Sequence, residues 1–377
     1  MNISVTPVRN CFHILITGAN GFVGKNIVAN ILEQEYKFED GDYIPYHLIQ
    51  VDDCSNSDEK QFEHDPKNMY FKKNVGEFAM DELSDETFPV PDVVIHLAAQ
   101  TDVRKSMKNP IDDLSSNVDD TAILLDVLKE RGFKGLFIFT SSGGAVYKQS
   151  PNCVPPFAES DPTGLPDSFY GLSKKVGEWY ILKYALEGKF SSTILRLSNL
   201  YGYGAKKGIV HILDQAMINN EPTVILNGGE QTRDYLHIHD LAKVLKTLVM
   251  DWYRNKAQGY GFRGIFNIGT GVETSLKALY EQVKYFHPDW QGEYVLAGYQ
   301  HGEVMRSVLD CRRFKDAYRK RTGKEFIFTP LQVGIANTIR FESIVRIQPE
   351  LPKDSEAYKR VIELADLEMK DCIFKIK

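Results

Sequence analysis

The chain has 377 residues, of which 43% are hydrophobic and 25% charged, and its formal net charge is −6 at pH 7. This composition is ordinary for a globular protein, and the length suits one large α/β domain or a domain with a smaller lobe. The absence of a basic cluster disfavours nucleic-acid binding, and no apolar run reaches the roughly 18 residues of a membrane span. The N-terminus also lacks the charged segment and apolar stretch of a secretory signal. We therefore expect no nucleic-acid or membrane partner.

The cysteines are odd in number, scattered, and never paired as Cys-x-x-Cys, which disfavours a disulfide framework and favours a reducing compartment. We therefore predict a cytoplasmic protein. No Cys/His-rich run suggests a metal site, and His237 and His239, two residues apart, are not expected to bind one. The cysteines are Cys11, Cys54, Cys153, Cys311 and Cys372.

Short apolar, β-branched segments alternate with helical patterns along most of the chain. The predicted strands are Phe12–Thr17, Tyr46–Val51, Met69–Lys73, Asp92–Leu97, Gly135–Ser141, Ser191–Leu197 and Ile265–Ile268. The predicted helices are Phe22–Gln34, Ile111–Arg131, Ser168–Glu187 and Ile238–Trp252. This alternation predicts an α/β fold with a Rossmann-like, doubly wound, mostly parallel sheet. The near-continuous apolar runs suit strands that are covered on both faces.

Composition and pattern divide the chain into three parts. We predict an NAD-binding domain over residues 1–200 that also takes back about 236–270, and a smaller substrate-binding lobe from 201–235 and 271–345. Residues 346–377 are expected to form a charged C-terminal tail. Two polar stretches, Lys37–Pro45 and Ser55–Asn68, are predicted to be surface loops.

A glycine-rich turn follows the first predicted strand directly and opens the first predicted helix. Glycines there let backbone N–H groups approach a pyrophosphate at the helix N-terminus. A Gly-x-x-Gly-x-x-Gly string has little specificity alone, but a strand before it and a helix after it favour a dinucleotide site. The predicted contacts are Gly18, Asn20, Gly21, Phe22, Val23 and Gly24.

A carboxylate at the end of the second strand can accept hydrogen bonds from the adenosine ribose hydroxyls, and it would repel a 2′-phosphate. Asp52 is the first choice for this role and Asp53 is the alternative. Because no Arg follows them, NAD is favoured over NADP. Small residues after the fourth strand would let a flat cofactor approach the backbone. These residues are Leu97, Ala98 and Ala99.

Tyr170 and Lys174 are four residues apart, so on a helix they share one face. An isolated Tyr has a pKa of roughly 10, and a neighbouring cation favours the ionised phenol. The pair is therefore a candidate proton acceptor. Two further pairs have the same spacing, so spacing alone does not identify the base. They are Tyr203/Lys207 and Tyr280/Lys284.

Eight segments over about 300 residues resemble, in order, the extended short-chain dehydrogenase/reductase family. Within it they are most similar to the NAD-dependent nucleotide-sugar epimerases and dehydratases, the UDP-glucose 4-epimerases above all. Of the three Tyr/Lys pairs, only Tyr170 follows a hydroxyl-bearing strand end, Thr140-Ser141-Ser142. The segments are TGANGFVG (17–24), HLAAQ (96–100), TSSGGAVY (140–147), YGLSK (170–174), RLSNLYGYG (196–204), GGEQTRDYLHIHDLA (228–242), FNIGTG (266–271) and HGEVMRSVLD (301–310).

The resemblance implies a triad of Ser, Tyr and Lys around the nicotinamide. Tyr170 would take the proton of a sugar hydroxyl as hydride leaves for NAD, and Lys174 would hold the cofactor ribose and lower the pKa of the Tyr. A Ser hydroxyl would orient the substrate oxygen, which is general acid–base work. The resemblance also implies cofactor contacts at Asn117 and Ser141, and a homodimer formed through the helices near 111–131 and 168–187.

The resemblance further implies a site for a nucleoside-diphosphate sugar. Asn199 resembles the sugar-diphosphate contact, and Arg233 resembles the phosphate-binding Arg, whose guanidinium offers bidentate donors. Arg196 is interpreted as structural. Gln300, at a position often held by a second phosphate-binding Arg, and Glu303 complete the predicted substrate site.

The strand end before Tyr170 departs from the family. Gly143 stands where many members carry the catalytic Ser or Thr. We expect Ser142, one place upstream, to replace it, and Ser141 or neither hydroxyl are the alternatives. A second departure is Lys148, which stands where the family has a Gly.

The same strand end distinguishes the reactions of the family. The 4,6-dehydratases carry an acidic pair there for proton transfer, and Gly143, Gly144 and Ala145 cannot transfer protons. We therefore expect NAD-dependent 4-epimerisation of a nucleoside-diphosphate sugar through a transient 4-keto intermediate. The alternative is a dehydrogenase or reductase of the same family with net cofactor turnover. A sensor or scaffold without catalysis is disfavoured by the intact Tyr170/Lys174 pair.

Overall fold

The structure is a computed structural model that describes residues 12–34, 46–56, 68–148, 150, 153–257, 259–297 and 304–347. The predicted loop Lys37–Pro45, most of the predicted loop Ser55–Asn68 and nearly all of the predicted tail lie outside these residues. Among the described residues, no helix is both long and apolar enough to cross a membrane.

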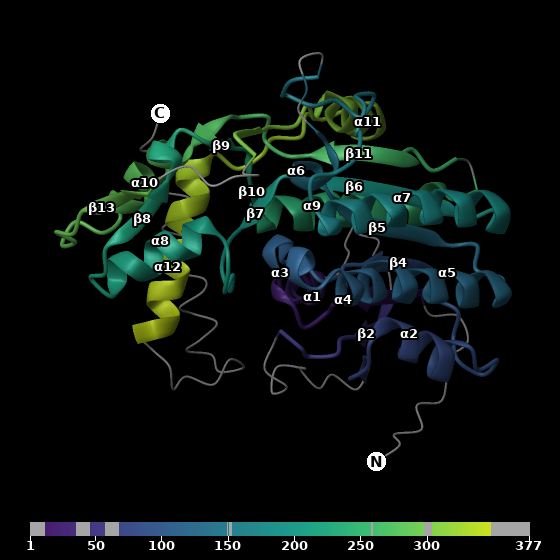
Figure 1. Cartoon of the computed structure of the whole chain (residues 1–377). Coiled ribbons are helices and arrows are strands. Elements are labelled where there is room, and N and C mark those ends of the chain that lie inside the picture. The colour runs from purple at the N-terminus through teal and green to yellow at the C-terminus, as the bar shows by residue number, and fades with distance from the viewer. Residues whose placement is uncertain are drawn as a thin grey trace.

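Seven parallel strands form the central sheet in the order β11-β6-β5-β4-β1-β2-β3 (Figure 1). The chain runs outward from β1 to β3 and then returns to place β4 on the other side of β1. The strand order therefore reverses between β1 and β4, where ligands bind at the carboxyl ends of such sheets. The predicted Rossmann-like sheet is confirmed. The strands are β1 (Phe12–Thr17), β2 (Tyr46–Val51), β3 (Met69–Phe71), β4 (Val93–His96), β5 (Leu136–Ser142), β6 (Ser191–Leu197) and β11 (Gly264–Ile268).

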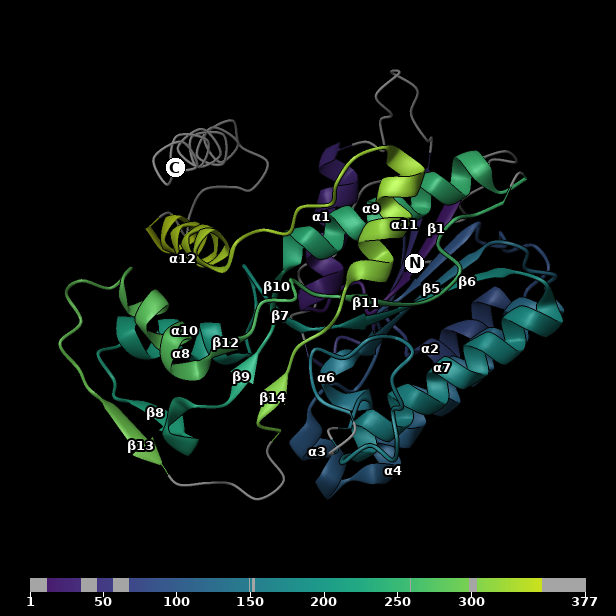
Figure 2. The ribbon, with the colours of Figure 1, turned by 90° about the horizontal axis from the view of Figure 1, so that it is seen from above.

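Helices cover both faces of the sheet (Figure 2). Successive side chains of a strand point to opposite faces, so Ile14 and Ile16 join one core cluster while Leu15 joins the other. This explains the near-continuous apolar runs of the strands. One face is covered by α1 (Phe22–Gln34), α9 (Ile238–Asn255) and α11 (Arg312–Thr322), and the other by α2 (Val75–Phe78), η2 (Ala79–Leu83), α5 (Asp120–Glu130) and α7 (Phe169–Gly188).

The helix predicted over Ile111–Arg131 is interrupted. It consists of α4 (Pro110–Leu114), a wide π-type turn η3 (Ser115–Asp119) and α5, and α3 (Val103–Lys108) precedes it. Such wide turns often mark functional sites within helices. Here the turn buries Asn117 and Val118 next to each other.

A second group of elements stands beside the sheet and has its own core, which includes Leu213, Leu279 and Trp290 (Figure 1). These elements fall within the predicted substrate lobe, whose boundaries stay a prediction. They are α8 (Ile209–Ile218), β8 (Thr223–Leu226), η4 (Asn227–Gly229), α10 (Leu276–Lys284), β13 (Tyr294–Ala297) and α12 (Leu331–Ile347). Short strands lie between the two groups: β7 (Asn199–Tyr201), β9 (Thr232–Arg233), β10 (Tyr235–His237), β12 (Thr274–Ser275) and β14 (Arg306–Ser307).

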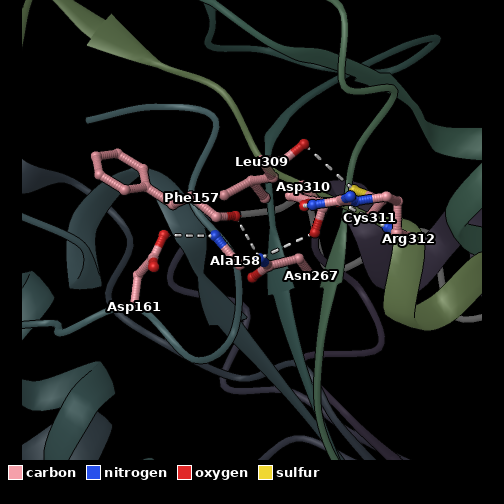
Figure 3. Close-up of polar contacts among 8 residues, drawn as sticks. All are labelled: Phe157, Ala158, Asp161, Asn267, Leu309, Asp310, Cys311 and Arg312. Atoms are coloured by element: carbon pink, nitrogen blue, oxygen red, sulfur yellow. Dashed lines mark hydrogen bonds and ion pairs between the residues drawn. The ribbon is translucent and has the colours of Figure 1, made fainter. Parts of the chain in front are cut away.

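Residues 308–311 cross back over the segment that follows β5, and we call them the return segment. The Phe157 N–H donates to the Val308 carbonyl at 2.9 Å, and the Asp310 N–H donates to the Phe157 carbonyl at 2.8 Å. Asn267, in β11, donates from Nδ2 to the Phe157 carbonyl at 2.8 Å and to the Asp310 carbonyl at 3.3 Å (Figure 3). The return segment thus ties the loop after β5 to the edge strand of the sheet.

Candidate active site

The glycine turn lies between β1 and α1, at the carboxyl edge of the sheet. The N–H groups of Gly18 and Ala19 donate to the Val51 carbonyl at 2.8 and 3.3 Å. Gly18 has a φ of +68°, and a Cβ there would lie 2.7 Å from the backbone nitrogen of Ala98. A Cβ at Gly24 would collide with the Gly18 carbonyl oxygen. The turn therefore has no space for a side chain at Gly18 or Gly24, and Phe22 and Val23 begin the helix behind it.

Asp52 lies against this turn, whereas Asp53 is exposed. The Asp52 carboxylate accepts from the N–H of Asn20 at 2.9 Å and from the N–H of Cys54 at 2.8 Å. Burial raises the Asp52 pKa, and these backbone hydrogen bonds oppose the rise. Asp53 instead accepts from the N–H and hydroxyl of Ser55. Of the two candidates for the ribose contact, the geometry favours Asp52.

The end of β4 forms the other wall of the cofactor site. Leu97 and Ala98 donate through their N–H groups to the backbone carbonyl and hydroxyl of Thr17, at 3.1 and 3.3 Å, and Ala99 follows them. Asn117 is buried beside this segment and exchanges two hydrogen bonds with the Gln100 backbone, at 2.8 and 3.0 Å. The cofactor residues predicted from four separate segments therefore line one edge of the sheet.

Tyr170 and Lys174 lie one turn apart near the start of α7. The helix begins there because the Ser168 hydroxyl accepts from the Gly171 N–H at 3.1 Å. Tyr170 is half-buried and Lys174 is 3% exposed. The Lys174 ammonium donates to the Thr140 carbonyl at 3.0 Å and lies 4.7 Å from the centroid of the Phe139 ring.

Burial shifts the acid–base chemistry of both groups. It raises the pKa of Tyr170 to about 12, while a hydrogen bond with Ser142 lowers it and the charge of Asp113 raises it further. Burial also lowers the pKa of Lys174 to about 8, against the opposing effects of Asp113 and Glu178. The expectation that Lys174 lowers the Tyr170 pKa is not met, because the ammonium bonds to the strand backbone and burial dominates.

Two hydroxyls of β5, those of Ser141 and Ser142, are the candidates for the third member of the triad. Ser141 is buried, and its hydroxyl donates to Glu178 Oε1 at 2.7 Å. The Ser142 hydroxyl instead forms a hydrogen bond with the Tyr170 phenol. A Cβ at Gly143 would lie 2.7 Å from two methyl carbons of Leu309. The return segment thus occupies the space that a side chain at position 143 would need.

The other two Tyr/Lys pairs lie elsewhere. Tyr203 is in the loop after β7, outside any helix. Tyr280 and Lys284 are on α10, where the Lys284 ammonium lies 5.9 Å from the Tyr280 ring centroid. Tyr280 is buried in the second core, so its spacing reflects packing.

Glu178 is a site-supporting residue that sequence reasoning missed. It is fully buried on α7, one turn after Lys174, and accepts two hydrogen bonds from Arg196 at 2.7 and 2.9 Å. Lys175 adds an ion pair at 3.1 Å. The four-residue spacing of Tyr170, Lys174 and Glu178 was the available signal. Arg196, 2% exposed, has the structural role that its sequence context suggests.

Two of the predicted substrate contacts, Asn199 and Arg233, lie on the short strands between the sheet and the second group of elements. Asn199 is exposed at the start of β7, and its N–H donates to the Asp234 carbonyl at 2.9 Å. Arg233 is half-buried on β9. Gln300 and Glu303 lie outside the described residues.

His237 and His239 pack ring against ring, with centroids 4.9 Å apart. Burial lowers the pKa of His237 to about 3. Within the described part of the chain, no group of three His, Cys, Asp or Glu side chains is arranged to hold a metal ion.

The sequence matches the NAD dependent epimerase/dehydratase family over residues 14–269. It is 34% identical over 304 residues to a Methanocaldococcus jannaschii protein named "Putative UDP-glucose 4-epimerase", covering 80% of this chain and 90% of that protein. It is 32% identical over 284 residues to dTDP-4-dehydro-6-deoxyglucose reductase of Escherichia coli, covering 72% and 81%. The structure of UDP-glucose 4-epimerase from Thermotoga maritima with UDP-glucose matches with a TM-score of 0.73 and 27% identity, over 88% of this chain and 99% of that one.

These likenesses confirm the resemblance inferred from the motifs, and with it NAD as the cofactor of the family. These relatives include both epimerases and a reductase. Membership of the family therefore establishes the fold and the cofactor, whereas the reaction is a separate question. A Cβ at Gly18 or Gly24 would collide with neighbouring backbone, and a turn without side chains at these positions fits a dinucleotide. The chain belongs to the NAD dependent epimerase/dehydratase family.

Proposed function

We propose that the protein is an NAD-dependent 4-epimerase of nucleoside-diphosphate sugars, with a UDP-sugar as its substrate. The observation that carries this proposal is the contact of Ser142 with the Tyr170 phenol at the carboxyl end of β5, with Lys174 one helical turn away. The epimerase relatives support the UDP-sugar.

Different residues of the chain would bind different parts of NAD. The backbone of Gly18 to Gly24 would face the pyrophosphate at the start of α1, and Asp52 would accept from the adenosine ribose. Asn117 and the segment from Leu97 to Ala99 would line the path toward the nicotinamide. When bound, NAD supplies the group that accepts hydride from the sugar and returns it.

Proton transfer falls to Tyr170 in this proposal. Its phenol would take the proton of the sugar C4 hydroxyl during oxidation and give it back during reduction, as a general base and then acid. The Ser142 hydroxyl would hold the C4 oxygen near the phenol. The 4-keto sugar would turn within the site and present its other face, while Asn199 and Arg233 keep the diphosphate bound.

The residues that follow the end of β5 are less compatible with a dehydratase than with an epimerase. Proton transfer to a leaving C6 hydroxyl needs an acid, and the residues at hand are Gly143, Gly144 and Ala145. Gly143 lies against Leu309, which leaves no space for a longer side chain there. Oxidation and re-reduction at one carbon needs Tyr170 and the cofactor only.

The purified protein tests this directly. Incubation with UDP-glucose, UDP-GlcNAc or UDP-glucuronate, without added cofactor, should give the C4 epimer of one of them in the proton NMR spectrum. Steady release of NADH during turnover would contradict an epimerase.

The second candidate is a nucleotide-sugar reductase, favoured by the 32% identity to the Escherichia coli dTDP-sugar reductase. This reaction would consume free cofactor. A fall in NADH absorbance on addition of a dTDP-4-keto sugar, together with no epimer from any UDP-sugar, would establish it.

A homodimer is also proposed, with the second copy on the face formed by α4 and α7. Large apolar side chains are exposed there, with Ile111 70% and Leu186 77% accessible. The others on these helices are Leu114, Phe169, Trp179, Tyr180 and Leu182. Light scattering should give twice the chain mass for the wild type, and Trp179→Glu should shift the protein toward the monomer. A monomeric wild type would refute this interface.

We also propose a cytoplasmic location. Cys54, Cys153 and Cys311 are free thiols, which suits a reducing compartment. Fractionation of the native cells should place the protein with cytoplasmic enzymes.

A further inference from the structure

Asp113 is a buried carboxylate that none of the sequence motifs includes. It lies on α4, which packs against the start of α7, and only 1% of its surface is accessible. Its Oδ1 accepts from Gln100 Nε2 at 2.9 Å and from Asn117 Nδ2 at 3.2 Å. Its Oδ2 is also buried and has no hydrogen-bond partner among the described residues.

The hydrogen-bond partners of Asp113 are neutral amides. A buried carboxylate is costly unless a positive charge compensates it. Glu178, the other buried carboxylate on this side of the sheet, is compensated by Arg196 and Lys175. Among the described residues no ion pair with Asp113 is found, so a cation at longer range is the available compensation.

Lys174 is that cation. Its ammonium bonds to the neutral carbonyl of Thr140 and lies over the Phe139 ring, so its immediate contacts carry no full negative charge. Of the carboxylates that favour its charged form, Asp113 has the larger effect and Glu178 the smaller. His96, on β4, also interacts electrostatically with Lys174, and burial lowers its pKa to about 3. His96 is therefore neutral near pH 7 and does not compete for Asp113.

Asp113 is also fixed relative to Tyr170. Asn117 Nδ2 donates to Asp113 and also to the Ser173 hydroxyl at 3.0 Å. That hydroxyl donates to the Tyr170 carbonyl at 3.0 Å. The buried chain of hydrogen bonds sets the distance between the carboxylate and the Tyr170–Lys174 pair.

We propose that Asp113 is the counter-charge of Lys174, a positioning residue that keeps Lys174 in its ammonium form and thereby sets the pH range in which the Tyr170–Lys174 pair works. It does not touch the sugar and acts only through the pair. Its kinetic consequence rests on the proposed function, whereas its effect on the charge of Lys174 does not.

The kinetic test compares Asp113→Asn with Asp112→Asn. Asp112 is the neighbouring residue on α4 and is exposed, so it controls for the loss of one charge near this helix. Asn at position 113 keeps an oxygen for the two amide donors and removes only the charge. Losing a nearby negative charge lowers the pKa of both a Lys and a Tyr. Because the two groups titrate as a pair, both limbs of the rate profile should move together.

We expect both limbs of the pH–rate profile of Asp113→Asn to move to lower pH by about one unit. This is the lower end of the pKa shift that one nearby charge causes. Asp112→Asn should keep the wild-type profile. A reduced rate for Asp113→Asn with both limbs unmoved would mean that Asp113 supports the fold only, and it would overturn the proposal.

A stability test needs no activity and so remains decisive if the proposed reaction is wrong. The Tm of wild type, Asp113→Asn, Lys174→Met and the double variant would be measured at pH 7. Lys174→Met leaves Asp113 without its cation, so adding Asp113→Asn to it should raise the Tm. Tm changes that simply add would overturn the proposal. A Tm coupling without epimer formation by the wild type would reject the epimerase and retain the counter-charge.

Discussion

The candidate proton acceptor, Tyr170, is a neutral phenol in its surroundings, since burial raises its pKa to about 12. Ser142 is the group that lowers this pKa, and in the proposed reaction its hydroxyl would hold the substrate oxygen. Proton transfer by Tyr170 would therefore depend on groups that bind together with the substrate. With only water in the site, Tyr170 would stay protonated.

Tyr170→Phe should remove general acid–base catalysis and lower turnover by about 10²–10⁴-fold. NAD binding should remain, because the glycine turn and Asp52 are untouched. Epimer formation by NMR and cofactor content after purification measure the two effects. Tyr280→Phe, in a Tyr/Lys pair of the same spacing, is the matched control and should retain activity. Near-normal turnover of Tyr170→Phe would remove this residue from the mechanism.

Gly143 should tolerate no side chain. Its Cβ would lie 2.7 Å from methyl carbons of Leu309, and overpacking of this kind costs about 1–3 kcal/mol. Gly143→Ala should therefore lower the free energy of unfolding in urea by that amount. At Gly144 the nearest atom is the Ser307 hydroxyl oxygen at 3.2 Å, which can rotate away. Equal losses for Gly143→Ala and Gly144→Ala would show that Leu309 is not the constraint.

At the level of elements, α7 carries both the candidate catalytic pair and a buried ion pair. Tyr170, Lys174 and Glu178 follow one another at four-residue intervals along one face of the helix. Glu178 fixes that face to β5 through Ser141 and to β6 through Arg196. The position of the catalytic pair relative to Ser142 therefore depends on a buried ion pair.

Glu178→Ala should destabilise the protein by about 3–5 kcal/mol, because Arg196 would be left buried without its partner. Glu187, also on α7, forms exposed ion pairs with Lys129 and Lys183. Such pairs contribute about 0–1 kcal/mol, so Glu187→Ala is the control. Urea unfolding of the two variants measures the difference, and similar losses would contradict a special role for Glu178.

Local patterns predicted the elements well where the signal is local. β1, β2, β6 and α1 have the predicted bounds, because apolar runs and the glycine turn define them. The helix predicted over Ile111–Arg131 is broken by η3, since Asn117 is held inward by the Gln100 backbone. That contact is not local, so periodicity could not reveal it.

The same difference between local patterns and long-range contacts applies to the candidate site. Ser142, Tyr170 and Lys174 belong to short motifs, and their positions could be predicted from sequence. Asp113 belongs to no motif, and the helical spacing was the one signal for Glu178, because the importance of both comes from Lys174 and Arg196 on other elements. The burial and the Asp113 charge that raise the Tyr170 pKa also depend on the assembled fold.

For the whole molecule, two buried histidines should make the fold sensitive to acid. Burial lowers the pKa of His96 and of His237 to about 3, from 6.5 in the unfolded chain. As the pH falls from 6.5 toward 3, the unfolded chain binds protons that the folded protein does not. Stability is therefore lost over this range, by about 1.4 kcal/mol per pH unit for each histidine.

Asp120, whose pKa burial raises to about 6, has the opposite effect, so the comparison should be made between wild type and His237→Gln. The free energy of unfolding would be measured from pH 6.5 to 5. We expect the wild type to lose about 1.4 kcal/mol more per pH unit than the variant. Parallel lines would mean that His237 titrates in the folded protein as it does in the unfolded chain.

The return segment has a consequence for the order in which this protein can be completed on the ribosome. A nascent chain that has not yet reached residue 306 would already contain β1 to β6, the glycine turn and Tyr170. Its Val146, Tyr147 and Phe157 would still lack the cover that Leu309 and Cys311 give them. The loop beside the catalytic strand would therefore be synthesised early and fixed late, and until then this part of the nascent enzyme would be exposed to chaperones and proteases.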